Sequence, residues 1–99
     1  MGEDGDTALM LAVRNGKYKA VKALIKGKAD VNIQRDTGST ALMRAARGGK
    51  TECAKILVDN KADTKLTNRR GQTAADLAKA AGHADTIELL DPGSTVASW

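Results

Sequence analysis

Residues 5–12 of the chain are Gly-Asp-Thr-Ala-Leu-Met-Leu-Ala, and residues 38–45 repeat them as Gly-Ser-Thr-Ala-Leu-Met-Arg-Ala. A third, weaker copy, Gly-Gln-Thr-Ala-Ala-Asp-Leu-Ala, occupies residues 71–78, so the copies recur every 33 residues. Nearly half of the positions in residues 5–34 are identical to those in residues 38–67, which is far more than chance allows. A fixed period of this size indicates stacked copies of one supersecondary unit.

Each copy has the pattern of two short helices joined by a tight turn. Thr7 suits the N-cap of a first helix, and Gly16 interrupts the pattern where a turn is needed. We expect Gly27, and Asn60 in the second copy, to be the left-handed residue that ends the second helix. That second helix carries an apolar stripe of Ala20, Val21, Leu24 and Ile25. The pattern predicts no long strands and six helices, at about residues 7–14, 17–26, 40–47, 50–59, 73–80 and 83–90.

Composition limits the classes of protein that the chain can belong to. It has 99 residues, enough for one small domain, and 41% of them are apolar. With no Phe, one Tyr and one Trp, it has to form its core by close approach of Ala-rich helices. We expect no membrane span and no secretory leader. One Cys and one His exclude an internal disulfide and a zinc site, and a reducing compartment is the default expectation. The net charge of +4 permits an acidic partner without demanding nucleic acid.

These strings, with Lys-Ala-Asp at residues 28–30 and again at 61–63, resemble the ankyrin repeat. The resemblance implies an all-α solenoid of three helix-turn-helix units with short hairpin-like turns. It covers roughly residues 2–90, and we expect a single domain at residues 1–91 followed by a tail at residues 92–99 that ends in Trp99. The three units are expected at about residues 2–34, 35–67 and 68–91.

The third unit has the character of a C-terminal cap. Lys79 and Asp76 stand where the other units have apolar residues, so we expect them to face water. The family usually has Pro after the repeated Thr, but this chain has Ala in every copy. It also usually has His three residues after that Thr, where this chain has Met10, Met43 and Asp76. His83 is in the family's other His position, which implies a hydrogen-bonded role between units.

No set of residues predicts catalysis. His83 has no second His or paired carboxylate beside it, as general acid–base chemistry would need. Cys53 lies on the apolar stripe of a helix and is expected to pack inertly, and Met10 and Met43 are expected in the core. Residues 47–51, Arg-Gly-Gly-Lys-Thr, lack the first Gly and the preceding strand of a phosphate-binding loop. We therefore expect no enzyme, no metal and no cofactor.

The arginines are distributed unevenly between the two helices of a unit. All of them fall in first helices or in the turns between units, whereas lysines dominate the second helices. In ankyrin-like stacks the turns and first helices form the concave face on which partners usually bind. Because a guanidinium binds carboxylate or phosphate bidentately, this face is the predicted binding surface. We expect Arg44, Arg47, Arg69 and Arg70 to be exposed and clustered there. The predicted contact residues are Arg14, Gln34, Arg35, Asp36, Arg44, Arg47, Asn68, Arg69, Arg70 and Gln72.

The resemblance favours a non-catalytic protein-interaction module, an adaptor, scaffold or inhibitor-like protein that binds an acidic segment of a partner protein. The alternative is binding of RNA or a phosphorylated small molecule on the same face, although the lack of aromatic stacking residues disfavours nucleic acid. A designed scaffold is a third interpretation, which the imperfect repeats disfavour. We expect a cytoplasmic monomer, with the nucleus as the alternative location.

Asn32 resembles the asparagine that ankyrin-directed hydroxylases modify, so it is a candidate for hydroxylation. The competing interpretation is that Asn32 only hydrogen-bonds within its own turn.

Overall fold

The computed structural model describes residues 7–92, and this part of the chain forms six α-helices and no strand. The helices are α1 (Ala8–Arg14), α2 (Tyr18–Lys26), α3 (Ala41–Gly48), α4 (Thr51–Asp59), α5 (Ala74–Ala81) and α6 (Ala84–Leu90). Each begins and ends within one residue of its expected range, so the all-α prediction is confirmed. Of the tail expected at residues 92–99, residues 93–99, which include Trp99, lie outside the described residues.

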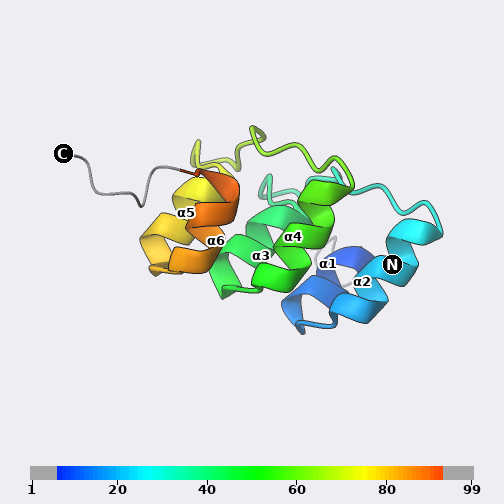
Figure 1. Ribbon diagram of the computed structural model, residues 1–99. Coiled ribbons are helices and arrows are strands. Elements are labelled where there is room, and N and C mark those ends of the chain that lie inside the picture. Colours follow the sequence, from blue (N-terminus) through cyan, green and yellow to red (C-terminus); the bar gives the residue numbers. More distant parts are fainter. Residues whose placement is uncertain (1–6, 93–99) are drawn as a thin grey trace.

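The helices form three antiparallel pairs that stack side by side. Unit one contains α1 and α2, unit two contains α3 and α4, and unit three contains α5 and α6. The first helices pack in one layer, with α3 against both α1 and α5, and the second helices pack in another, with α4 between α2 and α6 (Figure 1). The long loops between units run along one edge of the stack (Figure 1). This arrangement matches the expected solenoid.

Every first helix starts with the Thr that the pattern predicts as its N-cap. The side-chain oxygens of Thr7, Thr40 and Thr73 accept hydrogen bonds from the backbone N–H three residues further on, at 3.1–3.2 Å. In unit three, Asp76 accepts in return from the Thr73 N–H at 3.0 Å, which completes a capping box. These bonds fix where each unit begins, because they satisfy backbone donors that the first turn leaves without partners.

The left-handed residue after α2 is Lys28, with φ of 72°, and not Gly27, as the sequence pattern predicted. The same displacement occurs after α4, where Lys61 rather than Asn60 is left-handed, with φ of 69°. The Ala29 N–H donates to the carbonyl of Leu24 at 3.0 Å, which is the six-residue closure of a Schellman motif. That closure places the left-handed conformation one residue after the C-cap, so the prediction was wrong by one position.

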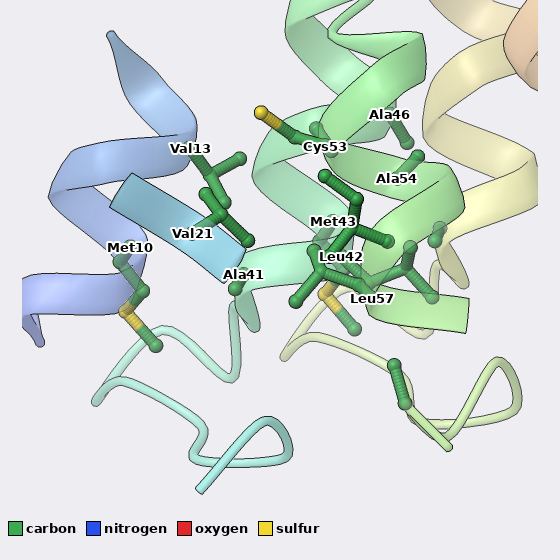
Figure 2. Close-up of a cluster of buried hydrophobic side chains, with 14 of the residues drawn as sticks. Met10, Val13, Val21, Ala41, Leu42, Met43, Ala46, Cys53, Ala54 and Leu57 are labelled. Carbon is green, nitrogen blue, oxygen red and sulfur yellow. The ribbon is translucent and has the colours of Figure 1, made fainter. Parts of the chain in front are cut away.

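The core consists of small and branched side chains between the two layers. Val13 and Val21 of unit one point toward unit two, where Cys53 lies (Figure 2). Leu42, Met43 and Leu57 gather between α3 and α4 (Figure 2). The predictions of core positions for Met10 and Met43 and of inert packing for Cys53 are confirmed, since all three side chains are buried. Ala45, Ala46, Ala54 and Ala78 are fully buried, which lets the helices approach closely.

The outer surface of unit three is polar, as expected for the end of a stack. Lys79 and Asp76 are both exposed, at the positions where unit two has Ala46 and Met43 in its core. The Lys79 Nζ donates to the Asp91 carboxylate at 2.9 Å. This bond and the direct charge attraction of Asp91 raise the pKa of Lys79 above its ordinary value.

Candidate binding groove

A groove of about 610 Å³ lies between the loops that precede units two and three. Its walls come from these two loops and its floor from α3 and α5. Most of the lining side chains are cationic or neutral hydrogen-bond donors, and Leu77 is the only aliphatic one. We call it the arginine groove. It is lined by Arg35, Thr37, Ser39, Arg44, Arg47, Asn68, Arg69, Arg70, Gln72 and Leu77.

The two loops end in hairpin-like turns that hydrogen bonds fix to one another. In the first turn the Arg35 N–H donates to the Ser39 carbonyl at 2.8 Å, and the second turn is closed in the equivalent way. The Arg69 N–H donates to the carbonyl of Thr37 at 2.9 Å, which joins the tips. Gly38 allows this approach, because a Cβ added there would lie 2.7 Å from the Asn68 Cα. The spacing of the groove walls is therefore set by the backbone.

Asn68 and Gln72 were predicted as partner contacts, but they also build the second turn. The Asn68 side-chain oxygen accepts from the backbone N–H groups of Arg70 and Gln72, at 2.9 and 3.0 Å. Its amide nitrogen donates to the Gln72 side-chain oxygen at 3.0 Å. The Asn68 side chain thus forms most of its hydrogen bonds within the turn. These bonds fix the turn that carries Arg69 and Arg70 at the groove.

Three of the four key arginines are exposed as predicted, and the fourth is not. Arg47, Arg69 and Arg70 are exposed, and within residues 7–92 their side chains form no ion pair. Arg44 is only half-exposed, with its Nε buried, so the prediction of four exposed guanidinium groups was wrong for this residue. Arg44 lies in the middle of α3, which is flanked by α1 and α5, whereas Arg47 lies in the last turn of that helix.

Two smaller grooves adjoin the arginine groove and hold the other predicted residues. A groove of about 190 Å³ is lined by Arg14 and Lys50 and shares Arg44 and Arg47 with the main one. Another of about 300 Å³ is lined by Gln34 and Asp36 and shares residues 35, 68 and 69. All ten predicted contact residues therefore line one connected set of grooves, and their role in binding stays a prediction.

Gln34 has a structural role in the second of these grooves. Its side-chain nitrogen donates to the carbonyls of Gly38 and Thr67, both at 3.0 Å. This amide links the loops of units one and two. The sequence pattern identified Gln34 by its place beside Arg35 and gave no sign of these two bonds.

Asn32 does more than hydrogen-bond within its own turn, so that interpretation was wrong. Its backbone N–H donates to the Asp30 carboxylate at 2.8 Å, which is the local turn. Its side-chain oxygen accepts from the Asp63 N–H at 2.7 Å, which ties unit one to unit two. The side chain is exposed, and its hydroxylation stays a prediction.

Two hydrogen bonds join units two and three on the side away from the loop tips. The His83 Nε2–H donates to the Arg47 carbonyl at 3.0 Å, which confirms the expected role of this histidine between units. The hydroxyls of Thr51 and Thr86 are hydrogen-bonded at 2.8 Å, and Thr86 is fully buried. The sequence pattern singled out neither threonine. The available signal in the sequence was that Thr86 stands at the position equivalent to the buried Cys53 of unit two.

The side chains that could serve chemistry are used in packing. Burial raises the pKa of the Cys53 thiol, with Lys50 opposing the shift and Glu52 adding to it. A thiol held neutral in this way is a poor nucleophile. Among residues 7–92 no group of three or more His, Cys, Asp or Glu side chains could hold a metal ion. The groove-lining hydroxyls of Thr37 and Ser39 were missed by sequence reasoning, although they alternate with Arg35 in a turn-rich segment.

Comparison with models of protein families gives a match over most of the chain. The family described as ankyrin repeats, in three copies, matches residues 9–97. No curated protein matches the chain. Of the helices in residues 7–92, none combines the length and apolar character needed to cross a lipid bilayer.

Proposed function

The chain belongs to the ankyrin repeat family, and from this premise we propose that its arginine groove binds an acidic segment of a partner protein. Ankyrin repeats are generally protein–protein interaction modules and are typically non-catalytic. We extend both properties to this chain. We also propose that it acts as a cytoplasmic monomer, with the nucleus as the alternative location.

The proposal is carried by the exposure and the shared location of three arginines, Arg47, Arg69 and Arg70. All three are exposed and line one groove whose walls are joined by a backbone hydrogen bond. A side chain whose backbone is already fixed loses less conformational freedom on binding, which favours affinity. Arginine is also enriched among the residues that dominate binding energy in interfaces. An acidic segment is the natural complement to such a surface.

The experiment is a pull-down from the source cells with tagged chain. We expect Arg47→Glu combined with Arg70→Glu to abolish capture of the partner. The matched control is Lys22→Glu with Lys55→Glu, which makes the same change of net charge on exposed positions of α2 and α4 outside the groove. The control should capture the partner normally. Equal loss in both double variants would indicate non-specific charge attraction, and no loss in either would place the partner on another surface.

The alternative ligands, RNA and phosphorylated small molecules, make a different prediction. Binding driven by backbone phosphates weakens steeply with salt and by similar amounts for any cation near the path. A protein partner should instead lose on the order of 1–3 kcal/mol for each central arginine removed and little for distant lysines. Titration of the captured complex with salt, for Arg47→Ala and Lys55→Ala, separates the two.

A further inference from the structure

The arginine groove carries more positive charge than a single carboxylate neutralises. Five arginines line it, contributed by both loops and by α3, and no Asp or Glu is among the lining residues. The neighbouring groove adds Arg14 and Lys50, again without an acid. One carboxylate takes one guanidinium in a bidentate pair. A cluster of this size around a single groove therefore favours an anion of higher charge, with more acceptor atoms, over a single carboxylate.

A phosphate monoester meets this requirement. It carries a charge of about −1.5 to −2 at neutral pH and three strong acceptor oxygens, so it can bind two or three guanidinium groups at once. The groove is lined by Arg47 from α3 and by Arg69 and Arg70 from the second turn, so its guanidinium groups come from two elements. Thr37 and Ser39 line the facing loop, where the Thr37 hydroxyl donates to the Ser39 Oγ at 3.2 Å.

The rest of the groove favours a peptide over the other carriers of phosphate. Leu77 is its only aliphatic lining residue, so the site lacks the apolar walls that hold the body of a small ligand. None of its lining residues is aromatic, although single-stranded RNA is usually held by stacking on such side chains. A peptide can gain further contacts along the adjoining groove of about 190 Å³, where Arg14 and Lys50 suit further acidic residues.

We infer that the acidic segment bound by this protein is phosphorylated, and that the arginine groove takes the phosphate of a phosphoserine or phosphothreonine peptide. The inference rests on the proposed function and adds the chemical identity of the anion. Arg47, Arg69 and Arg70 bind the phosphate, and Asn68 is a positioning residue whose side chain fixes this turn by accepting from the N–H groups of Arg70 and Gln72.

The test uses the full chain and three peptide mixtures with randomised, acid-rich flanks. The mixtures differ only in the fixed central residue, which is phosphoserine, glutamate or serine. We expect the phosphoserine mixture to bind more tightly than the glutamate mixture by on the order of tenfold, because one additional charge-assisted hydrogen bond is enough for that difference. Serine should bind more weakly than either.

Two variants test whether the guanidinium fork causes the preference. Arg70→Lys keeps the charge but removes the fork, so the phosphoserine preference should fall by several-fold while binding of the glutamate mixture changes little. Lys22→Gln, on an exposed position of α2 outside the groove, should leave the preference unchanged. A preference that survives Arg70→Lys and Arg47→Lys together would overturn the assignment.

The remaining outcomes separate this inference from the proposed function. Equal binding of the phosphoserine and glutamate mixtures would overturn the inference and leave an acidic-segment binder. Binding of free phosphoserine, or of a short RNA, as tight as that of the peptide mixture would also overturn it. If no mixture binds, the inference fails, and the proposed function fails with it only when partner capture is also insensitive to Arg47→Glu with Arg70→Glu.

Discussion

Within residues 7–92, the hydrogen bonds at the seam between units one and two differ from those at the seam between units two and three. In the first seam, the Asn32 side chain accepts from the Asp63 N–H and the Gln34 side chain donates to the Thr67 carbonyl, and these bonds join the loops. The second seam has a bond at the loop tips and further bonds, from His83 and between Thr51 and Thr86, on the other side of the stack. At the equivalent positions the first seam has Lys50, Tyr18 and a buried Cys53.

This difference bears on function because the arginine groove straddles the second seam. Residues 35–47 of its lining belong to unit two, and residues 68–77 belong to unit three. Directional bonds on both sides of that seam hold the walls at one spacing. The repeated units therefore pack in the same way, and residue differences at a few equivalent positions decide which seam can form a rigid site.

The largest expected effect concerns the core of unit two, which packs against a unit on each side. It tests whether losing a core side chain costs more stability there than in unit one. Leu57→Ala in unit two should destabilise the fold by about 2–5 kcal/mol, because this side chain is fully buried. Leu24→Ala, at the equivalent and half-buried position of unit one, should cost clearly less. Urea unfolding followed by circular dichroism measures both. If Leu57→Ala fails to fold, the Leu→Val pair compares the same positions, and equal losses would contradict the prediction.

A glycine pair tests the contact between the loop tips. Gly38 and Gly71 both have positive φ, so an Ala at either position should cost about 1–2 kcal/mol for conformation alone. Only at Gly38 does the added Cβ also meet backbone, at 2.7 Å from the Asn68 Cα. We expect Gly38→Ala to cost about 1–3 kcal/mol more than Gly71→Ala. It should also weaken partner capture, and equal stabilities would show that the tips separate freely.

A smaller effect concerns the partly buried hydrogen bond of the second seam. A double-mutant cycle of Thr51→Val and Thr86→Val should give a coupling energy of about 0.5–1.5 kcal/mol, since the pair makes one partly buried hydrogen bond. The same cycle on Tyr18→Phe and Cys53→Ala, at the equivalent positions of the first seam, should give a coupling near zero. An equally large coupling energy in the first seam would show that the two seams do not differ in this way.

The smallest expected effect is at the outer surface of unit three, away from both seams. Lys79 and Asp91 are exposed partners, so Lys79→Gln should barely change the thermal midpoint at neutral pH. Because Asp91 raises the pKa of Lys79, the contribution is present below the unfolded pKa and is lost as the pH rises through the folded one. As the pH rises from neutral, the small difference between wild type and variant should therefore persist until the solution is strongly alkaline. A difference that grows with pH would contradict this sign.

The sequence predicted the parts of the fold that depend on local rules. Thr7 and its equivalents cap their helices, because a Thr oxygen bonds the third N–H regardless of neighbours. The half-burial of Arg44 and the bond between Thr51 and Thr86 depend on how units stack, so no single repeat contains that information. The hydrogen bonds by which Asn68 closes its turn also could not be predicted. In the sequence, an amide beside two arginines suggests contact with a partner.

Differences between units also set a rule for building a longer array from this chain. A second copy of residues 35–67 inserted in register would place unit two against itself. Lys65 then faces the backbone N–H that Asn32 binds in the present first seam, and lysine has no acceptor for it. Thr67 likewise replaces the longer amide of Gln34. Lys65→Asn and Thr67→Gln in the first of the two copies are the changes that make the repeat self-compatible, and so turn a three-unit protein into a modular building block.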